Sequence, residues 1–155
     1  MRIMFVCHGN ICRSPMAEFI FKALLEERGI AEGFYVASSA TSDEEIYRGV
    51  GNPIYPPARR ELAAHGIFPP DKRAVRLSAD DLERYDMFVV MDGRNLTGAR
   101  SILGDDSKIY KLMDFTTRGG DVADPWYTDR FDIAYHDIYD GCVALKTQGF
   151  APQRV

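Results

Sequence analysis

Two residues near the amino terminus, Cys7 and Arg13, are of types and at a spacing that could bind and attack a phosphate. They bracket a short polar stretch between an apolar run and a segment of helical periodicity. A loop that enters a helix in this way points backbone N–H groups inward as an anion-binding nest. Arg13 adds a planar fork of donors that matches two phosphate oxygens. The pattern therefore predicts a phosphate site formed by His8, Gly9, Asn10, Ile11, Cys12 and Arg13.

Cys7, the first residue of this loop, is the candidate nucleophile. Hydrogen-bond donors and a helix N-terminus near a thiol favour the thiolate, which is its reactive form. A thiolate below a bound phosphoryl group can attack phosphorus in line and form a phosphocysteine intermediate, which divides one slow hydrolysis into two easier steps. Ser14 could donate a hydrogen bond to this thiolate, or its side chain could simply cap the following helix.

Each of these features has an ordinary structural interpretation when it is taken alone. A cysteine after an apolar strand is usually a small buried residue, and Gly-Asn after a strand is usually a turn. The combination Cys-x5-Arg-Ser at a strand-to-helix junction is more restrictive, because its spacing must fit around a phosphate. The combination therefore favours phosphate chemistry.

A second candidate group, Asp124 with Trp126 and Tyr127, lies far along the chain. A proton donor opposite the nucleophile helps to expel a phenolate, and Asp124 could supply that proton and later activate water. Asp-Pro is also a common start of a turn, so spacing alone leaves both interpretations of Asp124 open. The two aromatic rings could form a wall on which a phenyl phosphate lies, or Trp126 could only anchor its loop.

The elements that must position these residues follow an α/β order. Short apolar runs alternate with longer stretches of helical periodicity, which is typical of a parallel sheet with helices on both faces. We expect four strands, at 3–6, 34–37, 87–91 and 109–112. We expect about five helices, at 15–28, 58–65, 94–103 and 131–148, with a further short one that opens at 78–81.

Cap residues and loops set the expected limits of these elements. Ser14 and Ser78 are candidate N-caps, and Gly29 and Gly66 are placed to end helices. The connections 38–57 and 118–129 are expected to be long loops, which are either functional or mobile.

Length and composition narrow the class of protein. The 155 residues suit one domain, 1–155, and 46% hydrophobic residues suffice for a core. The net charge of −4 with scattered basic residues disfavours nucleic-acid binding. Because no apolar run approaches the ~20 residues of a membrane span, neither a span nor a leader is expected. Three cysteines without disulfide-framework or zinc spacing indicate a cytoplasmic protein with no metal and no cofactor.

The stretch from Cys7 to Glu18 resembles the opening of the low-molecular-weight protein tyrosine phosphatases. The similarity runs nearly end to end and includes Ser38–Asp43, His65–Ile67, Met91-Asp92 and Asp124-Pro125. The resemblance implies a three-layer, flavodoxin-like α/β fold with a four-stranded parallel sheet. It also implies that phosphotyrosine proteins or peptides are the substrates and that phosphate and other oxyanions inhibit.

The resemblance also implies roles for individual residues. Cys7 would be the nucleophile, Arg13 would bind phosphate and stabilise the transition state, and Asp124 would be the acid. Asn10 would hold the loop through a hydrogen bond to Ser38. In relatives a cysteine at the position of Cys12 can form a reversible disulfide with the nucleophile, although Cys12 could equally be a small loop-filling residue.

Two departures from the family pattern affect the pocket. We expect the connection 43–55 to supply the wall opposite Trp126 and Tyr127. Relatives commonly carry a large group shortly after the Ser-Asp pair that matches Ser42-Asp43, and we expect Tyr47 to replace it as a wall of the pocket. A histidine that supports the loop in relatives is missing, since the corresponding stretch reads Pro-Asp-Lys-Arg at 70–73. We therefore expect Asn10 to be held differently.

Three other activities must be weighed against this interpretation. An arsenate reductase on the same scaffold would need further cysteines, and 66–128 contains none. A phosphocysteine carrier would not need Arg13 or Asp124. A phosphotyrosine-binding module without turnover would not need to retain nucleophile, arginine and acid together.

Overall fold

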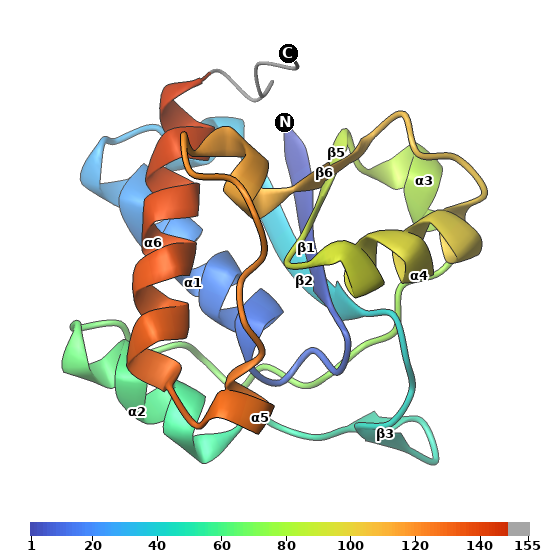
Figure 1. The fold of residues 1–155 in the computed structure, drawn as a ribbon, viewed down its shortest axis with the longest axis horizontal. Coiled ribbons are helices and arrows are strands. Elements are labelled where there is room, and N and C mark those ends of the chain that lie inside the picture. The colour runs from blue at the N-terminus through green and yellow to red at the C-terminus, as the bar shows by residue number, and fades with distance from the viewer. Residues whose placement is uncertain (149–155) are drawn as a thin grey trace.

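A four-stranded parallel sheet forms the centre of the molecule in the computed structural model, which describes residues 1–148 (Figure 1). Its strands lie in the order β2-β1-β5-β6. They are β1 (Arg2–Cys7), β2 (Tyr35–Ala40), β5 (Met87–Val90) and β6 (Ile109–Lys111), and all neighbours pair in parallel. The predicted α/β fold with a four-stranded parallel sheet is confirmed.

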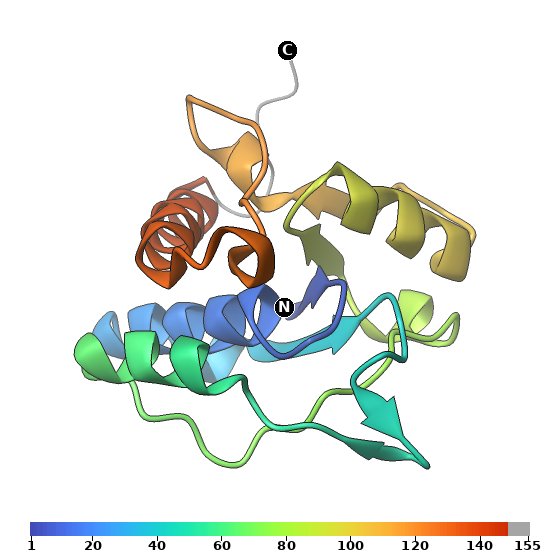
Figure 2. The ribbon, with the colours of Figure 1, turned by 60° about the horizontal axis from the view of Figure 1, so that its bottom comes forward.

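Helices cover both faces of this sheet, as Figures 1 and 2 show. The longer helices are α1 (Arg13–Glu27), α2 (Pro56–Ala64), α4 (Gly93–Leu103) and α6 (Phe131–Thr147). The shorter ones are α3 (Asp81–Arg84), α5 (Pro125–Thr128) and the 3-10 turns η1 (Ala31–Gly33) and η2 (Leu112–Phe115). Helices α1, α2 and α6 pack together on one face, and α4 lies on the other.

Strand β1 shows how the two faces acquire separate cores. Because successive side chains of a strand point to opposite faces, Ile3 and Phe5 join the core under α1 and α6. Met4 and Val6 join the second core under α4. All four side chains are buried, as a central parallel strand covered on both faces requires. The carboxyl end of this strand is thereby fixed in place.

Two predicted helix caps are wrong. Ser14 lies inside α1, and its hydroxyl contacts Asn10 and Cys7 instead of capping the helix backbone. The helix predicted at 78–81 begins only at Asp81, whose carboxylate accepts a hydrogen bond from the backbone N–H of Ser78. The residues at the N-cap positions of these helices are Cys12 and Asp80, and neither makes a side-chain cap hydrogen bond. The glycine ends are correct, since Gly29 and Gly66 follow their helices with φ of 67° and 79°.

Both long connections contain regular structure that was not predicted. Strands β3 (Ile46–Tyr47) and β4 (Val50–Gly51) form a small antiparallel hairpin. Its turn, Arg48-Gly49, has positive φ at both residues, which is the geometry of a tight two-residue hairpin. The second connection contains α5, which begins at Pro125. Within residues 1–148, no helix has the length and apolar character needed to cross a membrane.

The hairpin is attached to the body of the molecule where Gly51 meets the backbone of Ala74. A Cβ at residue 51 would lie 2.0 Å from the carbonyl oxygen of Ala74. Gly51→Ala should therefore lower the free energy of unfolding by about 1–3 kcal/mol, because backbone must move to admit the methyl group. Gly33→Ala is the control, since nothing lies within 4 Å of its added Cβ, and it should change stability by less than about 0.5 kcal/mol. Urea unfolding measures both, and equal stabilities would contradict this account.

Candidate active site

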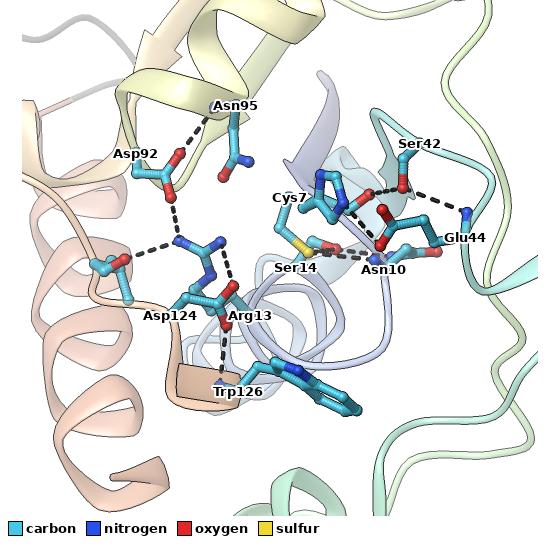
Figure 3. A network of polar contacts seen from close by, with 12 residues as sticks. Cys7, Asn10, Arg13, Ser14, Ser42, Glu44, Asp92, Asn95, Asp124 and Trp126 are labelled. Carbon is cyan, nitrogen blue, oxygen red and sulfur yellow. Dashed lines mark hydrogen bonds and ion pairs between the residues drawn. The ribbon is translucent and has the colours of Figure 1, made fainter. Parts of the chain in front are cut away.

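The loop between β1 and α1 lies at the carboxyl edge of the sheet, where open α/β folds bind their ligands. Cys7 ends β1 with 3% exposure, and Arg13 begins α1 with 2% exposure. Between them, Asn10 has a φ of 60°, a left-handed conformation that residues other than glycine rarely adopt. Its backbone N–H then donates to Cys7 Sγ at 3.3 Å. The loop thus curls around the sulfur atom (Figure 3).

Ser14 provides the second polar contact of the sulfur atom. Its Oγ lies 3.0 Å from Cys7 Sγ and accepts a hydrogen bond from Asn10 Nδ2 at 2.8 Å. The serine hydrogen remains to be donated, and the alternative acceptor, the carbonyl of Ser39, is more distant at 3.4 Å. Two hydrogen-bond donors therefore face Cys7 Sγ. Of the two roles expected for Ser14, this contact fits the support of the sulfur.

The side chain of Asn10 points away from the cavity and into the protein. Nδ2 donates to Ser38 Oγ at 3.0 Å as well as to Ser14, so the hydrogen bond expected between Asn10 and Ser38 is present. Oδ1 accepts from Val75 N and from Lys72 Nζ, each at 3.1 Å. All hydrogen-bonding capacity of this buried amide is used. The amide therefore ties the loop to β2 and to the segment 72–75.

Arg13 lies buried at the base of the cavity and is held by acceptors from two other segments. Its Nη1 donates to Asp92 Oδ2 at 2.7 Å and to the carbonyl of Val122 at 2.8 Å. Its Nη2 lies 3.4 Å from Asp124 Oδ2. Burial alone would lower the pKa of Arg13, but the charge of Cys7 and the Asp92 hydrogen bond raise it above its ordinary value. A fixed cation therefore faces the cavity beside the sulfur.

Asp92 is a site residue that the sequence interpretation missed. It lies two residues after the end of β5 and uses both carboxylate oxygens, because Oδ1 accepts the backbone N–H of Asn95 as the N-cap of α4. The other oxygen holds Arg13. A signal was available: the carboxyl ends of parallel strands meet at one edge of a sheet, so an acidic residue directly after a buried strand lies near the loop that follows β1.

Asp124 lies beside Arg13 and lines the same cavity as the nucleophile, at the N-cap of α5. Its Oδ1 accepts the backbone N–H of Trp126 at 3.1 Å, and its side chain is 26% exposed. Trp126 and Tyr127 both line the cavity. The Trp126 ring also packs against Tyr55, with ring centroids 5.0 Å apart. The aromatic wall that was predicted and the loop anchor offered as its alternative are thus combined in one residue.

The cavity itself has a volume of about 130 Å³ and lies directly above the sulfur. It is lined by Cys7, His8, Gly9, Ile11, Cys12, Arg13, Glu44, Glu45, Asp124, Trp126 and Tyr127. Of the predicted phosphate-binding residues, all but Asn10 are in this set. Asn10 contributes its backbone N–H to the sulfur instead.

The predicted wall residue Tyr47 does not line the cavity. It lies in the hairpin, 73% exposed, with the Arg48 guanidinium 5.4 Å from its ring centroid. Alternation along β3 turns Ile46 to the core and Tyr47 outward. Glu44 and Glu45 form this wall instead.

These two glutamates make the wall opposite the aromatic rings acidic. Glu44 pairs with His8 at 3.0 Å, and Glu45 accepts a hydrogen bond from Asn52 at 3.0 Å. The pair between His8 and Glu44 joins the loop after β1 to the connection that carries the hairpin. Both lie in the connection 43–55 that was expected to supply this wall, although Tyr47 was the residue expected there.

The other ionisable groups near the site do not form a metal centre. Among the described residues, no group of three or more His, Cys, Asp or Glu side chains is arranged to hold a metal ion. Cys12 is a free, buried thiol. Burial and then the negative charge of Cys7 raise the pKa of Cys12 well above its ordinary value. Cys12 therefore remains a thiol at neutral pH.

Comparisons with known proteins agree with this geometry. The model of the family "Low molecular weight phosphotyrosine protein phosphatase" matches residues 2–149. The low molecular weight protein-tyrosine-phosphatase YfkJ of Bacillus subtilis is 37% identical over 147 residues, which cover 92% of each chain. Its crystal structure superposes with a TM-score of 0.90 at 33% identity and covers 96% of this chain and 93% of that one. The low molecular weight protein-tyrosine phosphatase A of Mycobacterium tuberculosis is 35% identical over 137 residues, 86% of this chain and 80% of that protein.

The surroundings of the three cysteines predict selective alkylation. Burial raises the pKa of Cys142 as well as that of Cys12, whereas Cys7 lines the cavity and faces two donors. Iodoacetamide at neutral pH should therefore modify Cys7 at least about tenfold faster than either other cysteine. Tandem mass spectrometry can locate the label, and inorganic phosphate should protect Cys7. Preferential labelling of Cys12 would contradict the assignment.

Proposed function

The chain belongs to the low molecular weight phosphotyrosine protein phosphatases, and from this premise we propose that Cys7, Arg13 and Asp124 carry out its hydrolysis of phosphotyrosine. The observation that carries the proposal is their convergence on one cavity. A sulfur with two donors, a buried guanidinium and a partly exposed carboxylate face the same space. The phosphocysteine route, general to this family, needs these three groups.

In the first step the phosphate dianion lies in the loop, with Arg13 as the principal cation. The Cys7 thiolate attacks phosphorus while the bond from phosphorus to the phenolic oxygen breaks. Asp124 transfers its proton to that oxygen, so tyrosine leaves neutral. The loop N–H groups and Arg13 stabilise the charge that develops on the equatorial oxygens.

Contacts in the free protein explain how Asp124 can hold this proton. Without substrate, its carboxylate lies 3.4 Å from Arg13 Nη2. A bound phosphate dianion pairs with the Arg13 guanidinium and places negative charge beside Asp124. That negative charge favours the protonated form of the Asp124 carboxyl group. Substrate binding would therefore itself prepare the acid.

In the second step the same carboxylate acts as a base. Asp124 removes a proton from water, the oxygen attacks phosphorus, and the bond between sulfur and phosphorus breaks. Cys7 leaves as a thiolate, and the hydroxyl of Ser14 at 3.0 Å stabilises it. Phosphate is released, which accounts for the expected inhibition by phosphate and other oxyanions.

The walls of the cavity support a preference for phosphotyrosine in proteins or peptides. Trp126 and Tyr127 extend outward from the loop, so a phenyl ring can lie against them while its phosphate reaches the sulfur. A phosphoserine side chain is too short to make both contacts. We take residues 1–155 as one phosphatase domain, of which 149–155 lie outside the described residues. The free thiols of Cys7, Cys12 and Cys142 fit a cytoplasmic setting.

Hydrolysis of aryl phosphates by three proteins tests the proposal. Wild type should hydrolyse phosphotyrosine peptide and 4-nitrophenyl phosphate, and Cys7→Ser should lose more than about a thousandfold in kcat. Asp124→Ala should slow the peptide by about 10²–10³-fold. It should slow 4-nitrophenyl phosphate less, because that leaving group needs little protonation. Undiminished turnover by Cys7→Ser would refute the mechanism, and tight peptide binding without turnover by wild type would indicate a binding module.

The contact between Asp92 and Arg13 predicts a loss of activity with little loss of stability. Asp92→Asn keeps an oxygen for the N-cap of α4 but removes the charge that holds the guanidinium. The value of kcat/KM should fall about tenfold, because Arg13 is less firmly oriented. Asp106→Asn is the matched control, since it removes only an exposed ion pair with Arg100 at the other end of the helix. Equal kcat/KM values for the two variants would show that Asp92 acts only as a cap.

A further inference from the structure

Lys72 reaches the back of the phosphate loop from a segment far along the chain. Its Nζ lies 3.1 Å from each of three acceptors, which are Asn10 Oδ1, the carbonyl of Ser38 and the carbonyl of Arg73. Only a protonated amine has three hydrogens to donate. The geometry therefore fits an ammonium group, held between the loop, β2 and its own segment.

The hydrogen bonds from Lys72 to the sulfur all run in one direction. The ammonium and the backbone N–H of Val75 both donate to Asn10 Oδ1, which fixes the orientation of the amide. Asn10 Nδ2 must then donate to Ser14 Oγ. Because Ser14 receives that hydrogen, its own hydrogen is directed to Cys7 Sγ at 3.0 Å. A chain of donors thus ends at the nucleophile.

Several charges face this ammonium. Glu18 and Lys22 belong to α1, Cys7 lies in front of the loop, and Asp71 and Arg73 flank Lys72 and pair with each other at 3.1 Å. Burial lowers the pKa of Lys72, and the Glu18 carboxylate opposes that effect. The carboxylate of Glu18 also accepts from Ser38 Oγ at 2.6 Å, so it belongs to the same polar network.

We propose that Lys72 is a positioning residue of the phosphatase reaction: through Asn10, its ammonium orients Ser14 toward Cys7 and holds the nucleophile as a thiolate. This inference rests on the proposed function and adds a residue to it. Lys72 touches neither the cavity nor the substrate. Its effect should therefore appear in the ionisation of the nucleophile and not in the binding of the phenyl ring.

The test compares Lys72→Met with Arg73→Met. Methionine keeps the apolar stem but has no hydrogen to donate, and Arg73→Met removes a neighbouring positive charge that does not touch the loop. The rate at which iodoacetamide alkylates Cys7 is followed across a pH series by mass spectrometry. In Lys72→Met the pH of half-maximal rate should rise by about one unit. Below that midpoint, kcat/KM for an aryl phosphate should fall about tenfold in step with the thiolate fraction, while KM changes little.

Lys72→Arg provides a second measurement if the methionine variant does not fold, as judged by circular dichroism. Lys72→Arg keeps the charge with a different donor geometry. Its pH of half-maximal Cys7 alkylation should therefore rise by less than the shift of about one unit expected for Lys72→Met. A midpoint in Lys72→Met that matches Arg73→Met would overturn the proposal, as would a shift in Lys72→Arg as large as that expected for the methionine variant. Alkylation needs no turnover. If the wild type failed to hydrolyse aryl phosphates, the proposed function would fall, and the alkylation series would still decide the role of Lys72.

Discussion

The left-handed backbone at Asn10 is the constraint on which the geometry of the site depends. It curls the loop around Cys7 and costs about 1–2 kcal/mol relative to an ordinary conformation. The buried side chain of the same residue forms four hydrogen bonds, to Ser14, Ser38, Lys72 and Val75. At about 1 kcal/mol each, these bonds outweigh the cost. The strained residue is therefore held by parts of the chain that never touch the substrate.

The carboxylates around Arg13 hold this cation in place before a ligand binds. A buried cation is costly unless it has partners, and Asp92 and Asp124 lie on two sides of it. Asp92 is also fixed by α4, so it remains in place. Asp124 is more weakly held, at 3.4 Å, and a bound phosphate can take its place. Asp92 therefore has a structural role, which is to hold Arg13, and Asp124 is left available for the chemical one.

Residue types and periodicity predicted the sheet and the phosphate loop because both depend on local pattern. The uninterrupted apolar run at 87–91 can only be a strand buried on both faces, and Cys7 with Arg13 needs no distant partner to be recognised. Ser14, Tyr47 and Lys72 were harder. Tyr47 is decided by the turn of a hairpin and Lys72 by contacts with a distant segment, about which local propensity contains no information. For Ser14 the local pattern allowed two roles and could not choose between them. Asp92 was within reach, because its place after β5 follows from the topology.

The segments that meet at Asn10 lie far apart along the chain, and this affects how the site folds. The loop receives its support from Ser38 and from 72–75, while Arg13 receives its own from Asp92 and Val122. Closing such distant contacts costs chain entropy that local structure cannot offset. The left-handed residue is therefore stabilised only after β2 and the segment 72–75 have docked. A partly folded chain contains ordinary cysteines, and a reactive thiolate is produced only when folding is complete.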